Sequence, residues 1–139
     1  MSRWGFVNRL AERRNANEWR DRLQIRCRSI TQEVGALSGG NQQKVLLGSR
    51  LVAHPSFLVL NEPTRGVDVG TRVQIHQYLK QEASRGTSVL WVTSDIEEAV
   101  LVSDRLLVMR AGAVVGELTG TGMTQANALA LATGERAAA

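Results

Sequence analysis

The stretch Leu37-Ser38-Gly39-Gly40-Asn41-Gln42-Gln43-Lys44-Val45 decides the fold, because it combines a glycine-rich turn with the first residues of a helix. Ser38 is predicted to be the helix N-cap, since a serine hydroxyl can accept from the backbone N–H groups of the first turn. Gly39 and Gly40 carry no side chain, so a ligand can approach the backbone closely there. The unpaired N–H groups of a helix N-terminus favour an anion, and phosphate suits them best.

The chain after this turn predicts a helix and then a strand. The helix has an apolar face made of Val45, Leu46, Leu47, Leu51 and Val52. Residues 57–60 (FLVL) have the length and apolar character of a strand buried on both faces of a parallel sheet. Functional groups in such sheets lie just past the carboxyl ends of strands, and Glu62 stands at that place. A carboxylate there can also cap a loop, but the Pro-Thr-Arg-Gly sequence after Glu62 favours a functional role.

Together these motifs resemble the nucleotide-binding domains of ABC transporters. Residues 37–40 match the ABC signature, residues 57–62 the Walker B strand and residues 66–68 the D-loop. The longer strings LSGGNQQKV and NEPTRGVDVG resemble the second ATPase half of the tandem subunits that energise bacterial monosaccharide importers. The resemblance extends over nearly the whole chain. It implies an α/β fold, part of a P-loop NTPase (ABC ATPase), with parallel core strands, helices and a C-terminal antiparallel hairpin.

The resemblance also implies a role for each motif residue, with ATP and Mg²⁺ as cofactors. The residues that would contact an ATP held by a facing domain are Ser38, Gly39, Gly40 and Gln42. Glu62 would be catalytic and polarise the attacking water. Asp68 would lie at the seam between two ATPase domains. No residue is expected to bind the metal directly.

Two positions depart from the family pattern. Asn61 is neutral where the family has an aspartate that holds Mg²⁺ through its water shell, and hard cations prefer anionic oxygen ligands. Ser94 occupies the switch position, where most family members have a histidine that contacts the γ-phosphate. The sequence also contains no G-x-x-x-x-G-K-[ST] loop, which holds nucleotide phosphates in this family. We therefore expect an ATPase by family resemblance, with little activity from this chain alone, which would complete a site in trans.

Helices and strands are expected to alternate through the rest of the chain. The expected elements are helices over residues 10–23, 69–84 and 124–133, a strand over 88–93, a hairpin over 104–109 and 113–118, and a frayed tail over 134–139. The first of these helices would contact a permease or simply pack as a small helical lobe. The helix over 69–84 is expected to bury Val69, Val73, Leu79 and Ala83.

Local patterns suggest two further details. Ser94 and Glu97 fit a capping box at a helix start, with Ser94 as the N-cap. His54 and His76 have no second metal ligand at a suitable spacing, so both histidines are expected at the surface rather than in a metal site.

Composition limits the compartment and the partners. The chain has 139 residues and a formal net charge of +4, and this length fits one domain. No apolar run approaches the roughly 20 residues that span a bilayer. The single Cys27 cannot form an internal disulfide, so a reducing cytosol is the default. Many of the arginines lie between Arg3 and Arg28, several of them on an expected helix. This favours a solvated helical face, and no nucleic-acid partner is expected.

Under the resemblance the chain divides into three parts with defined partners. Residues 1–36 would be a remnant of the helical subdomain, residues 37–120 the C-terminal part of the ATPase core, and residues 121–139 a short helix and tail. The partners would be a second ATPase domain, membrane permease subunits and, indirectly, a sugar-binding protein. The location would be peripheral, on the cytoplasmic face of the inner membrane.

Two readings from other classes remain open. One is a non-catalytic interaction module or degenerate remnant, supported by Asn61, Ser94 and the missing phosphate loop. The other is a DNA-repair or chromosome-structuring ATPase, which shares the signature and Walker B arrangement but usually has long coiled-coil arms, whereas no sustained heptads occur here. In either case we expect a weakly stable chain, because a sheet without further strands exposes an unpaired edge.

Overall fold

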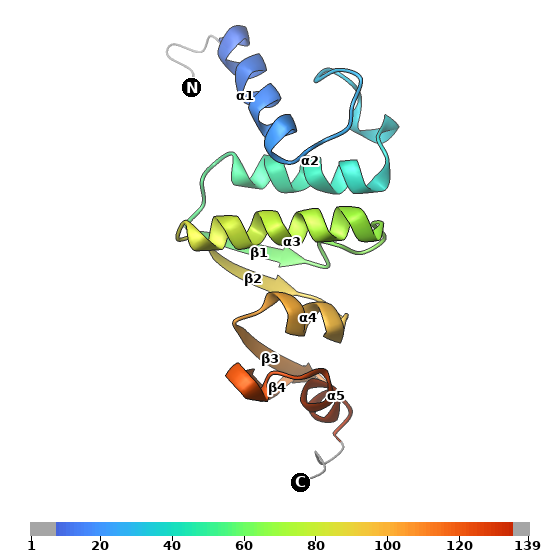
Figure 1. The fold of residues 1–139 in the computed structure, drawn as a ribbon, viewed down its shortest axis with the longest axis vertical. Helices are drawn as coiled ribbons and strands as arrows, with labels where there is room; N and C mark the ends of the chain where they lie inside the picture. The colour runs from blue at the N-terminus through green and yellow to red at the C-terminus, as the bar shows by residue number, and fades with distance from the viewer. Residues whose placement is uncertain (1–7, 135–139) are drawn as a thin grey trace. The chain divides into compact units, whose positions relative to one another are not determined.

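The computed structural model describes residues 8–134 of the chain (Figure 1). Its elements are α1 (Arg9–Arg22), η1 (Val34–Ala36), α2 (Gly39–Leu51), β1 (Phe57–Asn61), α3 (Val69–Ser84), β2 (Ser88–Val92), α4 (Ile96–Val102), β3 (Arg105–Arg110), β4 (Ala113–Thr119), η2 (Gly120–Gly122) and α5 (Gln125–Thr133). The expected order of helices and strands is confirmed. The tail expected after Gly134 lies outside the described residues.

The chain forms two compact units. Among the described residues, the first contains residues 8–58 and 63–90, and the second contains residues 59–62 and 91–134. Helices α1, α2 and α3 belong to the first unit. The hairpin of β3 and β4, with helices α4 and α5, belongs to the second.

Strands β1 and β2 pair with each other in a two-stranded sheet. The Ser88 N–H donates to the Ser56 carbonyl at the start of the strands (2.9 Å), and the Glu62 N–H donates to the Val92 carbonyl at their ends (2.8 Å). These bonds show that the strands run in the same direction, so the predicted parallel pairing is confirmed.

Burial on both faces of these strands was expected, and this prediction is wrong for the described chain. Leu58 is buried, but Phe57 and Val59 are 57% and 58% exposed. Leu90 and Val92 of β2 are also exposed. Alternate residues of a strand point to opposite faces, so one face of β1 is buried at Leu58 and the other is open.

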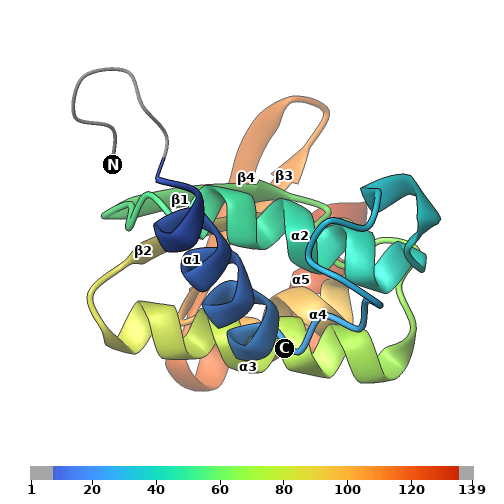
Figure 2. The same ribbon diagram turned by 90° about the horizontal axis from the view of Figure 1, so that it is seen from above.

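The core of the first unit forms where three helices meet. Helices α2 and α3 run side by side in both views (Figures 1 and 2). The Trp19 ring of α1 lies 6.3 Å from the ring of Tyr78 on α3. Gly48 of α2 allows α1 to approach, because a Cβ added there would lie 2.8 Å from a methyl carbon of Leu23. The residues buried in this core include Trp19, Leu23, Leu47, Leu51, Ile75, Tyr78 and Leu79.

Two helical faces differ from the expectation. On α3 the buried positions are Ile75, His76, Tyr78, Leu79 and Glu82, a stripe at helical spacing. Val69, Val73 and Ala83 lie outside this stripe and are exposed. Leu46 of α2 and Val52, the residue that follows this helix, are also exposed. His76 is therefore buried rather than at the surface, whereas His54 is exposed as expected.

The second unit contains an antiparallel hairpin covered by a helix. Strands β3 and β4 pair from Arg105 opposite Thr119 to Arg110 opposite Ala113. Ala111 and Gly112 form the turn, both with positive φ, as in tight hairpin turns. The predicted hairpin is thus confirmed. Helix α5 lies close against it, since a Cβ added at Gly116 would meet a Leu131 methyl at 2.6 Å.

Candidate functional site

The glycine-rich turn forms the start of helix α2, as predicted, but the serine hydroxyl does not cap the helix. Ser38 is the N-cap residue and its side chain makes no capping hydrogen bond. Instead the Asn41 side-chain amide donates to the Ser38 Oγ at 2.8 Å. Asn41 lies three residues into the motif, where a side chain can reach back to the N-cap and compete with the backbone for the hydroxyl. The hydroxyl proton of Ser38 is not used in this bond.

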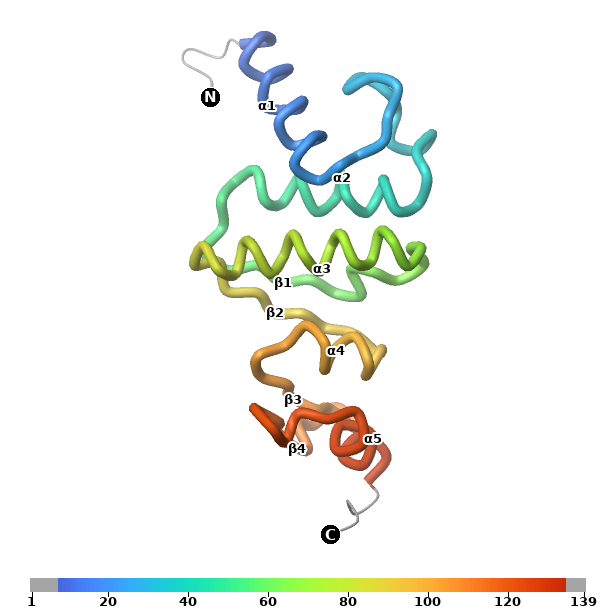
Figure 3. Tube along the Cα trace, in the orientation of Figure 1, coloured from blue at the N-terminus to red at the C-terminus, as the bar shows by residue number. Residues whose placement is uncertain are grey.

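The other polar side chains of the turn are tied to backbone groups. The Asn41 Oδ1 accepts from the Arg26 backbone N–H at 2.8 Å, so Asn41 links the turn to the loop that Figure 3 traces between α1 and α2. The Gln42 side-chain amide donates to the Leu37 carbonyl at 2.9 Å. Gln42 therefore stabilises the turn that leads into helix α2.

The two glycines of the turn have different surroundings. A Cβ added at Gly39 would meet no atom within 4 Å, so a ligand can approach the backbone at Gly39. A Cβ added at Gly40 would lie 2.7 Å from the Thr71 Oγ1. The open approach expected at both glycines is thus present at Gly39, while Gly40 lets helix α3 pack against helix α2.

Asp68 caps helix α3 and reaches the same threonine. One Asp68 oxygen accepts from the Thr71 backbone N–H at 2.9 Å, and the other accepts from the Thr71 hydroxyl at 2.8 Å. These two bonds hold the pKa of the Asp68 carboxyl below its ordinary value. Thr71 therefore touches both Gly40 and Asp68, and it fixes the glycine-rich turn relative to the loop that ends at Asp68.

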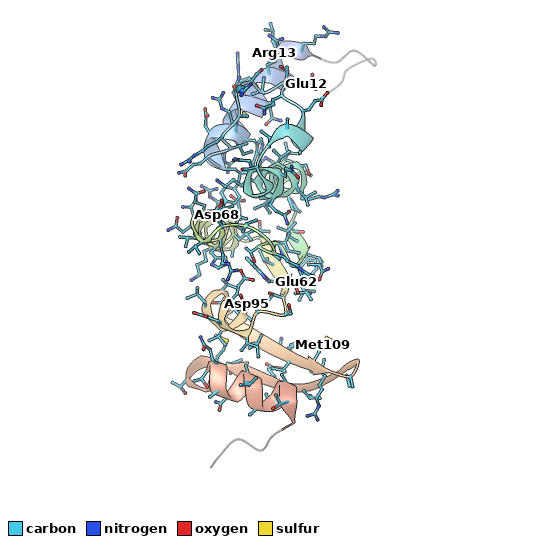
Figure 4. The ribbon with its side chains drawn as sticks, turned by 90° about the vertical axis from the view of Figure 1, so that its right-hand side faces the viewer. Glu12, Arg13, Glu62, Asp68, Asp95 and Met109 are labelled. Carbon is cyan, nitrogen blue, oxygen red and sulfur yellow. The ribbon has the colours of Figure 1, made fainter. Side chains whose placement is uncertain are left out.

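In the second unit the structure brings Glu62 together with Ser94. Glu62 follows β1 with a φ of 48°, and Figure 4 shows it near the end of the sheet. Its Oε1 accepts from the Ser94 backbone N–H at 2.9 Å. The two residues expected at the Walker B and switch positions are thus joined directly, through a backbone amide rather than a histidine side chain.

Comparison with known proteins identifies the relatives of this chain. No family model matches it. The ribose import ATP-binding protein RbsA of Rhodococcus jostii is 43% identical over 139 residues, which is 100% of this chain and 28% of that protein. The arabinose import ATP-binding protein AraG of Vibrio parahaemolyticus is 44% identical over 92% of this chain and 25% of its own length.

The chain is a relative of the sugar-import ABC ATPases. It spans about a quarter of the length of these relatives. Its fold is that of an ABC cassette: the dimeric structure of a bacterial ABC transporter cassette aligns with a TM-score of 0.73 at 28% identity, covering 85% of this chain and 50% of that one. A post-hydrolysis cassette bound to ADP and Pi aligns with a TM-score of 0.74 at 28% identity, over 84% of this chain and 50% of its own.

The ABC signature helix also carries a buried lysine that the sequence reasoning missed. Lys44 is 5% exposed, and its ammonium donates to the Gln24 carbonyl at 3.2 Å and to the Gln74 side chain at 2.5 Å. Burial, and then the positive charge of Arg26, lowers the pKa of Lys44, while Asp68 opposes this shift. The sequence feature that could have identified Lys44 is its position four residues after Gly40, on the helical face that packs against α3.

Thr93 and Glu98 lie beside Glu62. The sequence reasoning missed both residues. The Thr93 hydroxyl lies 3.1 Å from the Glu98 carboxylate and 3.4 Å from the Glu62 carboxylate, and it accepts from the Asp95 N–H. One hydroxyl carries one proton, so Thr93 can donate to only one of these carboxylates at a time. The sequence feature that could have identified Thr93 is its position as the first residue after β2, because functional groups in parallel sheets lie at the carboxyl ends of strands.

The cap of helix α4 differs from the predicted capping box. Asp95, not Ser94, is the N-cap, and its carboxylate accepts from the Glu98 N–H at 3.0 Å. Aspartate caps a helix as well as serine does, and its choice moves the helix start by one residue. The Ser94 N–H is then available to Glu62.

Asn61 and Glu62 are the oxygen donors at the end of β1. Asn61 offers a neutral amide oxygen, and the Glu62 Oε1 accepts a hydrogen bond from the Ser94 N–H. The pair thus brings one negative charge, whereas hard cations prefer anionic oxygen ligands. Within residues 8–134 no group of three His, Cys, Asp or Glu side chains is placed to hold a metal. Within the same residues no helix combines the length and apolar character needed to cross a bilayer.

Proposed function

We propose that this chain supplies the signature, Walker B and D-loop regions of an ATP site at the interface between two ATPase domains of a sugar importer. The observation that carries the proposal is the start of α2, where the backbone at Gly39 is open and the Ser38 proton is not used by Asn41. Both features suit donation to a phosphate oxygen. The names of the relatives and the dimeric cassette support the importer and the interface.

The proposed roles follow from these contacts. Ser38 and Gly39 would donate hydrogen bonds to the terminal phosphate of a nucleotide held by the facing domain. ATP would supply the phosphoryl group that water attacks. At a separate site, formed around this chain's own Walker B region, Glu62 would orient and deprotonate the attacking water, and the Ser94 N–H holds its carboxylate in place. Asp68 would contact the facing domain. Two hydrogen bonds from Thr71 hold its carboxylate in a fixed position beside the signature.

The proposed assembly includes membrane components. The facing partner would be a second ATPase domain, and residues of the helical subdomain, within 8–36, would face the permease. A sugar-binding protein would take part indirectly, from the other side of the membrane. This arrangement places the chain on the cytoplasmic face of the inner membrane.

We expect low hydrolysis at the site formed around this chain's own Walker B region. Asn61 brings no negative charge to attract Mg²⁺, and Ser94 contributes only its backbone amide to Glu62. These same observations favour a second candidate, a non-catalytic module that completes the facing site without turning over ATP itself. Asn61→Asp distinguishes the two, because it should raise turnover only if the local site is competent.

The test is addition of this chain to a purified, intact first-half ATPase domain of a sugar importer. We expect the two to co-purify and the steady-state ATP turnover of the partner to rise. Ser38→Ala should lower this stimulation without preventing co-purification. If turnover stays unchanged and the two proteins do not associate, the proposal is wrong.

A further inference from the structure

The loop between α1 and α2 and the start of helix α2 line an open groove of about 610 Å³. We call it the arginine groove and define it by Arg20, Arg26, Cys27, Arg28, Ser38 and Asn41, which line it. Its volume lies within the range of small-molecule sites. All of these residues belong to the first unit.

The groove is positively charged, because three arginines and no aspartate or glutamate are among the described residues that line it. Arg20 pairs with Asp21 at 2.7 Å. In the described part of the chain, the guanidinium groups of Arg26 and Arg28 make no ion pair or hydrogen bond. Their planar forks match the geometry of phosphate oxygens.

Hydrogen bonds hold the backbone of the two arginines in place beside the signature. The Arg26 N–H donates to the Asn41 side chain, and Asn41 in turn donates to Ser38. The Arg28 N–H donates to the Gln32 side chain at 2.8 Å. A loop fixed in this way loses little conformational entropy when an anion binds. The groove is therefore built to receive several negative charges next to Ser38.

We propose that the arginine groove binds the polyphosphate chain of a nucleoside triphosphate and that Arg26 and Arg28 neutralise its charge. The inference rests on the proposed function, since the same nucleotide would meet Ser38. It goes further because it assigns a part in phosphate binding to a loop outside the signature.

Cys27 provides a direct test, because it is the only cysteine of the chain and lines the groove. The rate of its alkylation by iodoacetamide, a neutral reagent, is measured with increasing inorganic triphosphate. We expect a saturable, several-fold decrease in rate. Adenosine, and sodium chloride at matched ionic strength, should leave the rate unchanged. An equal decrease with sodium chloride would show charge screening and overturn the proposal.

Substitutions of single arginines show which side chains bind the triphosphate. Arg26→Gln and Arg28→Gln should each weaken triphosphate binding about tenfold, the size expected for one lost charge-assisted hydrogen bond. Arg50→Gln is the matched control, since Arg50 is exposed in the last turn of α2 and carries the same charge. Equal weakening in all three variants would overturn the groove as a specific site. Protection by triphosphate without protection by ATP would overturn the nucleotide assignment.

The groove and the proposed function fail in different ways. If the parent chain binds triphosphate through Arg26 and Arg28 but does not stimulate an intact ATPase domain, the groove stands and the trans-site function is overturned. If the double variant loses triphosphate binding yet stimulates as well as the parent, the function stands and the role of the groove is overturned.

Discussion

The Thr93 hydroxyl has one proton and lies near two carboxylates, those of Glu62 and Glu98. Substitution of Thr93 therefore measures how much this hydroxyl contributes to stability around Glu62. Thr93→Val removes the acceptor of the Asp95 N–H and the donor to Glu98. We expect the free energy of unfolding to fall by about 1–3 kcal/mol. Thr93→Ser keeps the hydroxyl and should lose much less. Urea unfolding of both variants measures this difference, and equal losses would show that the hydroxyl contributes no more than the methyl group that Thr93→Ser removes.

Tyr78 is the only tyrosine of the chain, and its environment should be visible in its titration. Burial, and then the negative charge of Glu82, raises the pKa of Tyr78 to about 12. The folded state thus keeps the phenol proton that the unfolded state loses near the ordinary tyrosine pKa of 10. Stability should therefore fall as pH rises from about 10 towards 12.

The near-ultraviolet absorbance of tyrosinate checks this expectation. The midpoint should lie near 12 in the native chain and near 10 in urea. Tyr78→Phe should remove the corresponding part of the alkaline loss of stability. Coincident midpoints in native and unfolded chains would show that the phenol is not buried.

Single-residue environments were the least predictable level from sequence. His76 and Lys44 are both buried, although sequence reasoning assigned the first to the surface and gave the second no role. Charged and polar residue types are mostly exposed, and only their position on a packed helical face overrides this tendency. Glu62 was found from sequence because it follows a strand directly, whereas Thr93 and Glu98 required the observed hydrogen bonds.

Among the elements, the contact between α2 and α3 rests on Gly40. A methyl group there would meet the Thr71 hydroxyl at 2.7 Å, and rotating Thr71 away would break its bond to Asp68. Gly40→Ala should lower the free energy of unfolding by about 1–3 kcal/mol, as overpacking does. Gly39→Ala is the matched control, since its surroundings are open, and it should cause no loss.

The double variant Gly40→Ala with Thr71→Ala should recover part of this loss. Urea unfolding of the parent, the two single variants and the double variant gives the coupling energy between the two positions. Additive losses would show that the helices do not meet at this pair.

Element boundaries were largely predictable, but the faces of the helices were not. Helix α3 begins after Asp68 and ends before Gly86, which are strong start and stop signals. The predicted face of Val69, Val73, Leu79 and Ala83 shares only Leu79 with the buried face. Apolarity alone did not distinguish this face from that of Ile75, Tyr78 and Leu79. The choice depends on Trp19 and α2, which pack from distant parts of the sequence.

At the scale of the whole molecule, the exposed strand residues dominate the expected behaviour. Phe57, Val59, Leu90 and Val92 are 46–58% exposed, and within residues 8–134 strands β1 and β2 pair only with each other. Unpaired edges and apolar strand faces promote association between chains. We expect the isolated chain to aggregate on heating, and a sharp, reversible thermal transition well above room temperature would contradict this.

A matched pair of valines tests the origin of the aggregation. Val59 on β1 and Val114 on β4 are 58% and 57% exposed. Val59→Thr should reduce light scattering on heating more than Val114→Thr, because helix α5 packs against the hairpin that contains Val114, whereas four apolar residues of β1 and β2, Val59 among them, are exposed. Equal effects of the two substitutions would show that total apolar exposure matters rather than the open sheet.

The order of elements and the ABC fold were predictable, because they follow from local motifs in a fixed sequence. The division into two units was not, because residues 59–62 group with the second unit through contacts distant in sequence. Local patterns identify strand β1 but give no information about which neighbours its last residues will have.

The left-handed backbone of Glu62 has an evolutionary consequence under the proposed function. A positive φ strains a residue with a side chain by about 1–3 kcal/mol, and glycine avoids this strain. One base change converts either glutamate codon into a glycine codon. Drift that preserves folding alone would therefore tend to replace Glu62 by glycine. Among natural copies of this gene, a glutamate at this position indicates continuing selection on the carboxylate. A glycine indicates a lineage in which hydrolysis is no longer under selection.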